Sequence, residues 1–396
     1  MKTFRSVSWV CFIILFVGLL AQLPLSAQPF VYLTDVPDYN WFAGCFGTAS
    51  GNLAGFWDRH GYSNIYTGLV DNGVAPLRDE GKTGIQSLWV TQAGVDGRPS
   101  NKPGHINDYY IDYESTGQDP YVTAGRAEHS PDCIGDFIGL SQNKWASLNG
   151  ECRGNIDAYS FVFWDKTGNR RNNYYTTNAG VYVPDIGSGF REWMRWRGYD
   201  ADVFTQLADF NPERTTTNGF TYEDVKREID AGFPVLCFLQ PNGVYSRNGV
   251  NPPIHGVMII GYFTDPFFSK GVVIRTSWGV GFDPESLGYW FQEWTGASWM
   301  SLFPVRGVIG FHPKPKIRSF VRSGGNLTLA WDGPASLLHD YIAGTTSGPV
   351  QKYLVQRATN LNTGDWKSVA GPTTETTVTI PQPSDSSVFY RVVIQQ

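Results

Sequence analysis

The stretch from Cys45 to Gly61 limits most strongly what this chain can fold into. Its apolar residues recur at intervals of three and four, which predicts an amphipathic helix that begins at Cys45. Glycine recurs every fourth residue on one face of this helix, at Gly47, Gly51 and Gly55. Each glycine costs about 1 kcal/mol relative to alanine, so we expect another segment to pack closely there. Gly61 can end the helix in a left-handed conformation.

The second half of the main unit predicts a helix followed by buried strands. Thr221 can cap the helix through its hydroxyl, and Gly232 can end it. Short apolar runs bounded by glycine and turn residues predict strands from Pro234, at residues 255–262 and at residues 271–278. This order of elements indicates the α+β class.

A change of texture at residues 312–316, where two prolines are spaced by lysines, predicts an extended linker and the main domain boundary. Beyond it, short alternating runs separated by Gly, Pro, Asn and Ser predict a small antiparallel β-sandwich. The expected strands cover residues 326–331, 351–357, 375–380 and 388–394. We therefore divide the chain into three segments, residues 1–27, 28–313 and 314–396.

The first of these segments has the pattern of a signal peptide. Lys2 and Arg5 precede an apolar run, and the small pair Ser26 and Ala27 follows it, which predicts cleavage after Ala27. The run is short for a bilayer crossing, so we expect a secreted protein, extracellular or periplasmic, without a membrane span. The formal net charge of −5 gives no basic face for nucleic acid.

Five cysteines occur, and Cys11 belongs to the signal segment. Cys133 and Cys152 lie in polar, loop-like sequence, and in an oxidising compartment a disulfide between them is one option. Cys237 lies inside an apolar run and is expected to pack as a small hydrophobic residue. Cys45 is the thiol of interest, because unpaired N–H groups and the dipole at a helix start favour the thiolate. The alternative for Cys45 is a buried structural thiol or half of a disulfide.

Three motifs carry a family resemblance. Cys45 heads a glycine-rich helix, His255 heads the run His-Gly-Val-Met-Ile-Ile-Gly-Tyr, and the run Arg275-Thr-Ser-Trp-Gly follows. Together with residues 228–235, they resemble the peptidase domains that process double-glycine leader peptides, which are papain-like cysteine peptidases. The last run is similar to the Asn-Ser-Trp-Gly signature that follows the catalytic histidine in that superfamily. The resemblance covers residues 39–289, and the C-terminal segment resembles fibronectin type III-like modules in texture.

This resemblance implies a papain-like domain in which the helix that carries Cys45 packs on an antiparallel sheet. It implies that Cys45 is the nucleophile and His255 the general base. Asn40 and the backbone N–H of Cys45 would donate to the oxyanion. Thr276 stands where these families have the Asn or Asp that orients the histidine; its hydroxyl can accept a hydrogen bond but holds the ring less firmly. The residues expected to line the substrate groove are Gly44, Trp278 and Gly279.

The sequence therefore predicts a secreted cysteine peptidase that hydrolyses peptide or amide bonds of an extracellular peptide or protein without a cofactor. Attack of an amine on the same thioester would give transpeptidation instead. The alternative is a catalytically degenerate peptidase-like domain that binds an extracellular peptide or glycan. We expect no metal site, because the one cluster of ligand types, between His105 and Asp136, matches no closed metal motif. The C-terminal module is a candidate for binding a surface or polymer.

Overall fold

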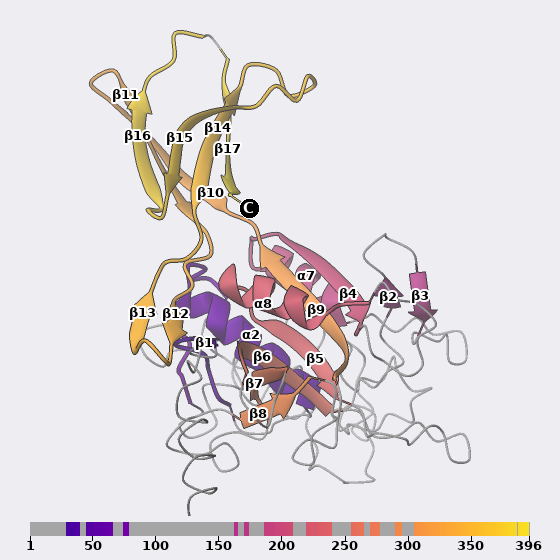
Figure 1. Ribbon diagram of the computed structural model, residues 1–396. Coiled ribbons are helices and arrows are strands. Elements are labelled where there is room, and N and C mark those ends of the chain that lie inside the picture. The colour runs from indigo at the N-terminus through magenta and orange to yellow at the C-terminus, as the bar shows by residue number, and fades with distance from the viewer. Residues whose placement is uncertain are drawn as a thin grey trace, which may run out of the picture.

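Figure 1 shows the computed structural model of the chain. The structure describes residues 29–39, 45–65, 74–78, 162–164, 170–173, 186–208, 219–239, 255–264, 270–277, 290–294, 305–385 and 387–395. Within these ranges, helices pack on a large antiparallel sheet and two smaller sheets follow, so the chain belongs to the α+β class. None of the helices in these ranges has the length and apolar character needed to span a membrane.

The large sheet contains nine strands. Its main path runs in the order β13-β12-β1-β6-β5-β9-β4, and β7 and β8 continue from the side of β6. All its pairings are antiparallel. The strands are β1 (Phe30–Leu33), β4 (Ala201–Leu207), β5 (Val235–Leu239), β6 (His255–Phe263), β7 (Gly271–Arg275), β8 (Trp290–Glu293), β9 (Val305–Pro313), β12 (Leu338–Asp340) and β13 (Thr345–Ser347).

The predicted first helix is present as α2 (Cys45–Arg59) and begins at the expected residue. It packs against β6 and β5, and Phe56 and Trp57 are fully buried. The glycine face is closely packed, because a Cβ at Gly55 would lie 2.6 Å from the hydroxyl of Tyr39. Gly61 ends the helix with a φ of 109°, as its position predicts.

The second predicted helix is α8 (Tyr222–Asp230), and its cap follows the sequence pattern. The hydroxyl of Thr221 accepts the N–H of Asp224 at 3.1 Å, and the carboxylate of Asp224 accepts the N–H of Thr221 at 2.7 Å. Gly232 then adopts a φ of 82° and leads into β5. Cys237 on β5 is 1% exposed, which confirms that it packs in the core.

Several elements of the main unit were not predicted from the sequence. Helix α7 (Ile186–Trp196) leads into β4, which pairs with β9 along its length. A separate two-stranded sheet joins β2 (Val162–Trp164) and β3 (Arg170–Asn173). The expected linker is short, because β9 ends at Pro313 and the next strand begins at Lys316. It is also held in place, since the N–H of Lys314 donates to the carbonyl of Asp200 at 2.8 Å.

The C-terminal module contains two three-stranded antiparallel sheets. One has the order β10-β11-β16 and the other β15-β14-β17. Their facing sides bury a core that includes Leu329, Trp331 and Val355. Four of the strands match the predicted runs, while β10 and β15 were not predicted. The bounds are β10 (Lys316–Ser323), β11 (Asn326–Asp332), β14 (Tyr353–Ala358), β15 (Lys367–Thr373), β16 (Thr377–Pro381) and β17 (Phe389–Ile394).

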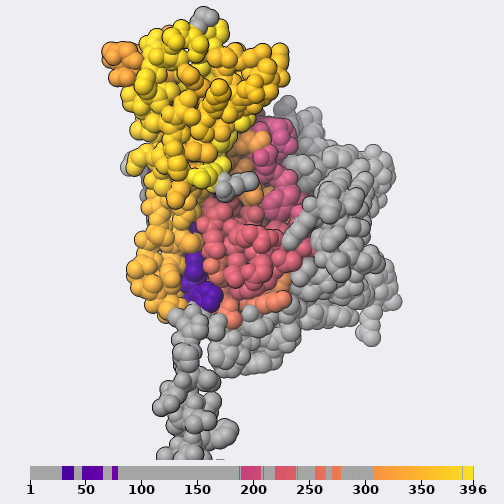
Figure 2. Space-filling model, turned by 45° about the horizontal axis from the view of Figure 1, so that its top comes forward, coloured from indigo at the N-terminus to yellow at the C-terminus, as the bar shows by residue number. Residues whose placement is uncertain are grey.

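One hairpin of the module belongs to the large sheet. Strands β12 and β13 lie between β11 and β14 in the chain, yet β12 pairs with β1, with Tyr32 opposite His339. Strand β1 is therefore enclosed between β12 and β6. Figure 2 shows the orange hairpin running down the molecule beside indigo residues of the N-terminal part. The first described strand and a hairpin of the C-terminal module thus share one sheet.

Candidate active site

The first residues of helix α2 and strand β6 lie toward the same end of the large sheet. At the other end, the C-terminal module contacts the last turn of α2, where the N–H of Ala335 donates to the carbonyl of His60, and the start of β5, where Ser336 Oγ donates to Gly232. Strand β5 runs away from the module and its last residue, Leu239, pairs with His255. Helix α2, about 22 Å long, also runs from Cys45 toward the module along β6 (Figure 1).

His255 is the first residue of β6 and is held by a main-chain acceptor. Its Nε2 lies 2.6 Å from the carbonyl oxygen of Thr276. A carbonyl can only accept a hydrogen bond, so Nε2 carries the hydrogen, and in the neutral ring Nδ1 keeps its lone pair. The family resemblance predicts the hydroxyl of Thr276 in this role, whereas the backbone oxygen of Thr276 makes the contact.

The surroundings of His255 keep its ring neutral. Burial lowers the pKa of His255 to about 4, and the hydrogen bond to Thr276 opposes this effect. Thr276 itself is 2% exposed. At neutral pH the ring is therefore an uncharged base rather than a cation, which is the form that can accept a proton.

Ser277 is a residue of this site that the sequence analysis quoted only as part of a motif. Strand β7 ends at Arg275, earlier than predicted, and Ser277 has a φ of 68°. Its hydroxyl donates to the carbonyl of Gly256 at 2.8 Å, and the residue is fully buried. Serine rarely adopts the left-handed region, so the motif that contains Ser277 does not predict this conformation.

Helix α2 presents its N-terminus at Cys45. The side chain of Cys45 lies outside the described residues, but the main chain of the helix is described. The first N–H groups of a helix have no partner within it, and the aligned peptide dipoles add partial positive charge at this end. An anion such as a thiolate or an oxyanion is stabilised at such a position.

The chain just before Cys45 is tied to the histidine side of the site. Arg275 Nη2 donates to the carbonyl of Val36 at 2.8 Å. Asn52, buried on α2, accepts the N–H of Tyr39 at 3.0 Å. The sequence predicts neither contact, because each side chain bonds to the main chain of another segment. Together they connect β7 and α2 through the same short segment.

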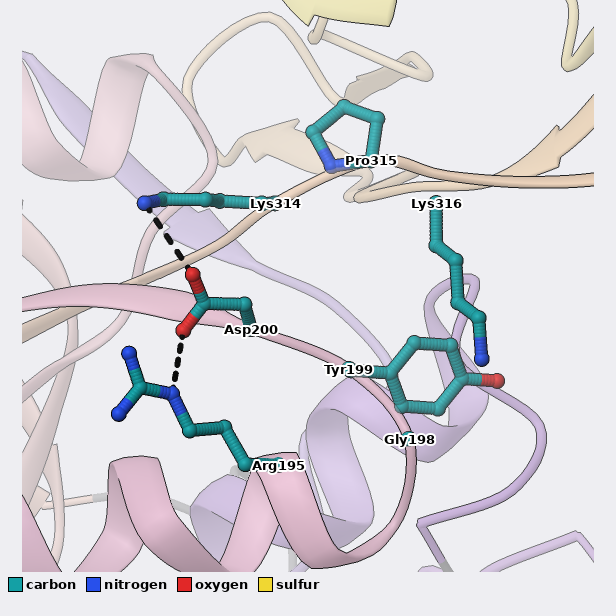
Figure 3. Close-up of a pocket in the computed structure, with 7 residues that line it drawn as sticks. All are labelled: Arg195, Gly198, Tyr199, Asp200, Lys314, Pro315 and Lys316. Carbon is teal, nitrogen blue, oxygen red and sulfur yellow. Dashed lines mark hydrogen bonds and ion pairs between the residues drawn. The ribbon is translucent and has the colours of Figure 1, made fainter. Parts of the chain in front are cut away.

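A separate pocket of about 400 Å³ lies where α7, β4 and the connection to the module meet. In Figure 3, Arg195 and Lys314 approach Asp200 from two sides, and the ammonium of Lys316 lies beside the ring of Tyr199. Partial burial raises the pKa of Asp200, but hydrogen bonds from Arg195, from the Ala201 N–H and from Lys314 outweigh it and bring this pKa to about 2. Three cations and one carboxylate line this pocket, and the ion pairs among them are partly exposed, so we assign this pocket no chemistry.

Several predicted residues lie outside the described part of the chain. They are Asn40, Gly44, Trp278, Gly279, Cys133 and Cys152, together with the cluster between His105 and Asp136. Among the residues that are described, no group of three or more His, Cys, Asp or Glu side chains is arranged to hold a metal ion.

Comparison with known proteins gives no relative. No protein-family model, no curated protein and no solved structure matches this chain. Any function therefore has to be argued from its own residues.

Proposed function

We propose that this chain is an exported thiol hydrolase of peptide or amide bonds, built on a papain-like arrangement, with Cys45 as nucleophile and His255 as general base. One observation carries the proposal. A helix that begins with a cysteine and a strand that begins with a histidine point their first residues toward the same end of one sheet. The histidine is moreover partly buried, neutral at pH 7 and bonded through Nε2 to a carbonyl.

In the proposed reaction, Nδ1 of His255 takes the thiol proton of Cys45, and the sulfur attacks the carbonyl carbon of the substrate. The tetrahedral intermediate collapses as His255 returns the proton to the leaving amine, which leaves a thioester on Cys45. Water then attacks the thioester with His255 again as base, and the carboxylic acid leaves. An amine in place of water would yield a new amide.

Charge on the carbonyl oxygen has to be stabilised while it develops. The backbone N–H of Cys45, at the first position of α2, is the donor we propose for this task. Asn40, five residues before Cys45 in the sequence, supplies the second donor in this proposal. Loss of one such donor typically costs about 2.7–4 kcal/mol in the barrier.

The decisive test compares Cys45→Ala with Cys237→Ala. We expect Cys45 of the exported chain to react with iodoacetamide faster than a free thiol at neutral pH, because its helix position favours the thiolate. Cys237 should stay unlabelled, since it is buried and burial raises the pKa of its thiol. Turnover of a quenched-fluorescence peptide mixture should vanish in Cys45→Ala and survive in Cys237→Ala. Equal turnover in Cys45→Ala and the parent chain would refute the proposal.

A second candidate function is binding without turnover. Thr276 motivates it, because the position lacks the amide or carboxylate that orients the histidine in the families this chain resembles. In that case the groove would hold a peptide or glycan, and Cys45→Ala would leave affinity intact. Saturable binding of a peptide or glycan by the parent chain, without labelling of Cys45 and without cleavage, would favour this function over hydrolysis.

A further inference from the structure

The acceptor that His255 uses is part of the main chain, and this changes what the neighbouring residues must do. An Asn, Asp or Thr side chain can rotate away from an imidazole, and a hydroxyl can also donate. The carbonyl of Thr276, 2.6 Å from Nε2, moves only if the backbone around residues 276 and 277 moves. Whatever fixes that backbone therefore fixes the tautomer of His255.

The backbone at this point leaves the sheet through a left-handed residue. Strand β7 pairs with β6 as far as Arg275, opposite Met258. Continued pairing would place Ser277 opposite Gly256, the residue next to His255. Instead Ser277 turns out of the ladder with a φ of 68°, a conformation that costs a residue with a side chain about 1–3 kcal/mol.

The hydroxyl of Ser277 stabilises this turn. It donates to the carbonyl of Gly256 at 2.8 Å, and so takes the place of a main-chain N–H in the ladder. Ser277 is fully buried, so water cannot replace the bond. This bond joins Ser277, the residue after Thr276, to Gly256, the residue after His255. It therefore keeps the carbonyl of Thr276 and the ring of His255 at a fixed separation.

We propose that Ser277 is a positioning residue: its left-handed backbone and its hydroxyl bond to Gly256 hold the Thr276 carbonyl on Nε2 of His255, so that a backbone oxygen replaces the usual orienting side chain. This inference deepens the proposed function and rests on it for its catalytic meaning. It assigns the hydroxyl of Thr276 no role in orienting the ring. It also explains how the site can lack Asn or Asp at this position and still present Nδ1 as a base.

The test uses two variants of Ser277 and a matched control. Ser277→Ala and Ser277→Gly both remove the hydroxyl, and glycine also tolerates the left-handed backbone. Thr276→Val removes the neighbouring hydroxyl but keeps the carbonyl and the branched shape. The tautomer of His255 is measured by ¹⁵N NMR of histidine-labelled protein, and the spectrum of His255→Gln identifies its signals among the six histidines.

We expect the parent chain and Thr276→Val to show the Nε2–H tautomer, and both Ser277 variants to show a mixture. For turnover we expect kcat to fall about tenfold in the Ser277 variants, the usual size of effect for one lost hydrogen bond, with KM within about twofold. Thr276→Val should keep both constants within about twofold. If Ser277→Ala does not fold, Ser277→Gly provides the same comparison without the backbone strain.

An unchanged tautomer in a folded Ser277 variant would overturn the inference, and so would a tautomer change in Thr276→Val alone. The two proposals can fail separately. If the tautomer responds as expected while the parent chain hydrolyses no peptide, the positioning role stands and the proposed hydrolase is wrong. If hydrolysis depends on Cys45 but Ser277 leaves tautomer and kcat unchanged, the hydrolase stands and the positioning role is wrong.

Discussion

The two ends of helix α2 are built differently. At its last turn, His60, Gly61 and the start of β5 meet the C-terminal module through several buried contacts that share residues. Toward the other end, His255 bonds to the carbonyl of Thr276, and the hydroxyl of Ser277 donates to the carbonyl of Gly256. Among the described residues, several contacts join the module to one end, and hydrogen bonds to main-chain carbonyls position the histidine at the other.

This contrast indicates a division of work along the same elements. Residues at the module end should contribute mainly to stability, because each of them is buried against another part of the chain. Residues at the histidine end should affect turnover more than stability, because their geometry sets a proton position rather than a packed volume.

The largest effect is expected from Gly61→Ala. A Cβ at Gly61 would lie 2.0 Å from the carbonyl oxygen of Gly333, and the φ of 109° is itself unfavourable for alanine. The junction would have to move, so we expect urea unfolding to show a loss of about 3 kcal/mol. Turnover per folded molecule should stay unchanged at low temperature.

Gly324→Ala is the matched control, since Gly324 also has a positive φ, 56°, but nothing lies within 4 Å of its added Cβ. Only the cost of placing alanine in a left-handed backbone conformation remains there, about 1 kcal/mol. Equal losses in the two variants would show that the contact with Gly333 does not contribute, and would weaken the contrast between the two ends.

A smaller loss is expected from Gln351→Ala. Gln351 is 3% exposed, accepts the N–H of Ser336 at 2.9 Å and donates to the carbonyl of Ala231 at 2.9 Å. Its removal leaves buried main-chain groups without partners, which costs about 1–3 kcal/mol. Gln356→Ala serves as control, because Gln356 only accepts an exposed bond from Arg391 and should change stability by about 0.5 kcal/mol or less. A larger effect in the control would contradict the assignment.

Local signals explain what could be predicted from the sequence. Helix α2 follows from its apolar spacing and from the glycine that ends it. Helix α8 follows from its cap residue, the capping carboxylate and the glycine after it, which lie within a few residues of one another. Strands β5, β6 and β7 follow from short apolar runs. The hairpin of β12 and β13 was missed, because its strands are three residues long and β12 pairs with a strand about 300 residues earlier in the chain.

The candidate site was predicted in part for a similar reason. Cys45 is the first residue of α2 and His255 is the first residue of β6. The start of a helix or of a strand can be recognised from the sequence. Which atom of Thr276 meets His255, however, depends on backbone direction, and backbone direction is not encoded in the identity of a side chain. The left-handed conformation of Ser277 was equally hidden, since glycine or asparagine normally marks it.

Acidification should affect the two ends in different ways. Burial lowers the pKa of His255 to about 4, so the neutral base is present above this pH and lost below it. We expect kcat/KM to fall about tenfold per pH unit below a midpoint near 4. Burial also lowers the pKa of His60; the unfolded chain therefore binds protons at both histidines more readily, and stability should fall as the pH drops below about 6.5.

His60→Gln separates the two effects of acidification. It should lessen the decline of stability below about pH 6.5, measured by unfolding at each pH, without abolishing it, because the lowered pKa of His255 contributes to the same decline. The midpoint of kcat/KM should stay where it is. A shift of that midpoint in His60→Gln would mean that the two ends are coupled, which contradicts the division of work.

The smallest effect is expected from Lys314→Ala in the connection between the main unit and the module. Lys314 pairs with Asp200 at 3.3 Å and with Asp202 at 2.7 Å, but the side chain of Asp202 is 71% exposed. Such pairs contribute about 0–1 kcal/mol and are screened by salt, and the main-chain bond from Lys314 to Asp200 remains. We expect a loss below about 1 kcal/mol that shrinks further in high salt. A loss as large as that of Gln351→Ala would mean that charge at the connection, and not the buried contacts, holds the module on the sheet.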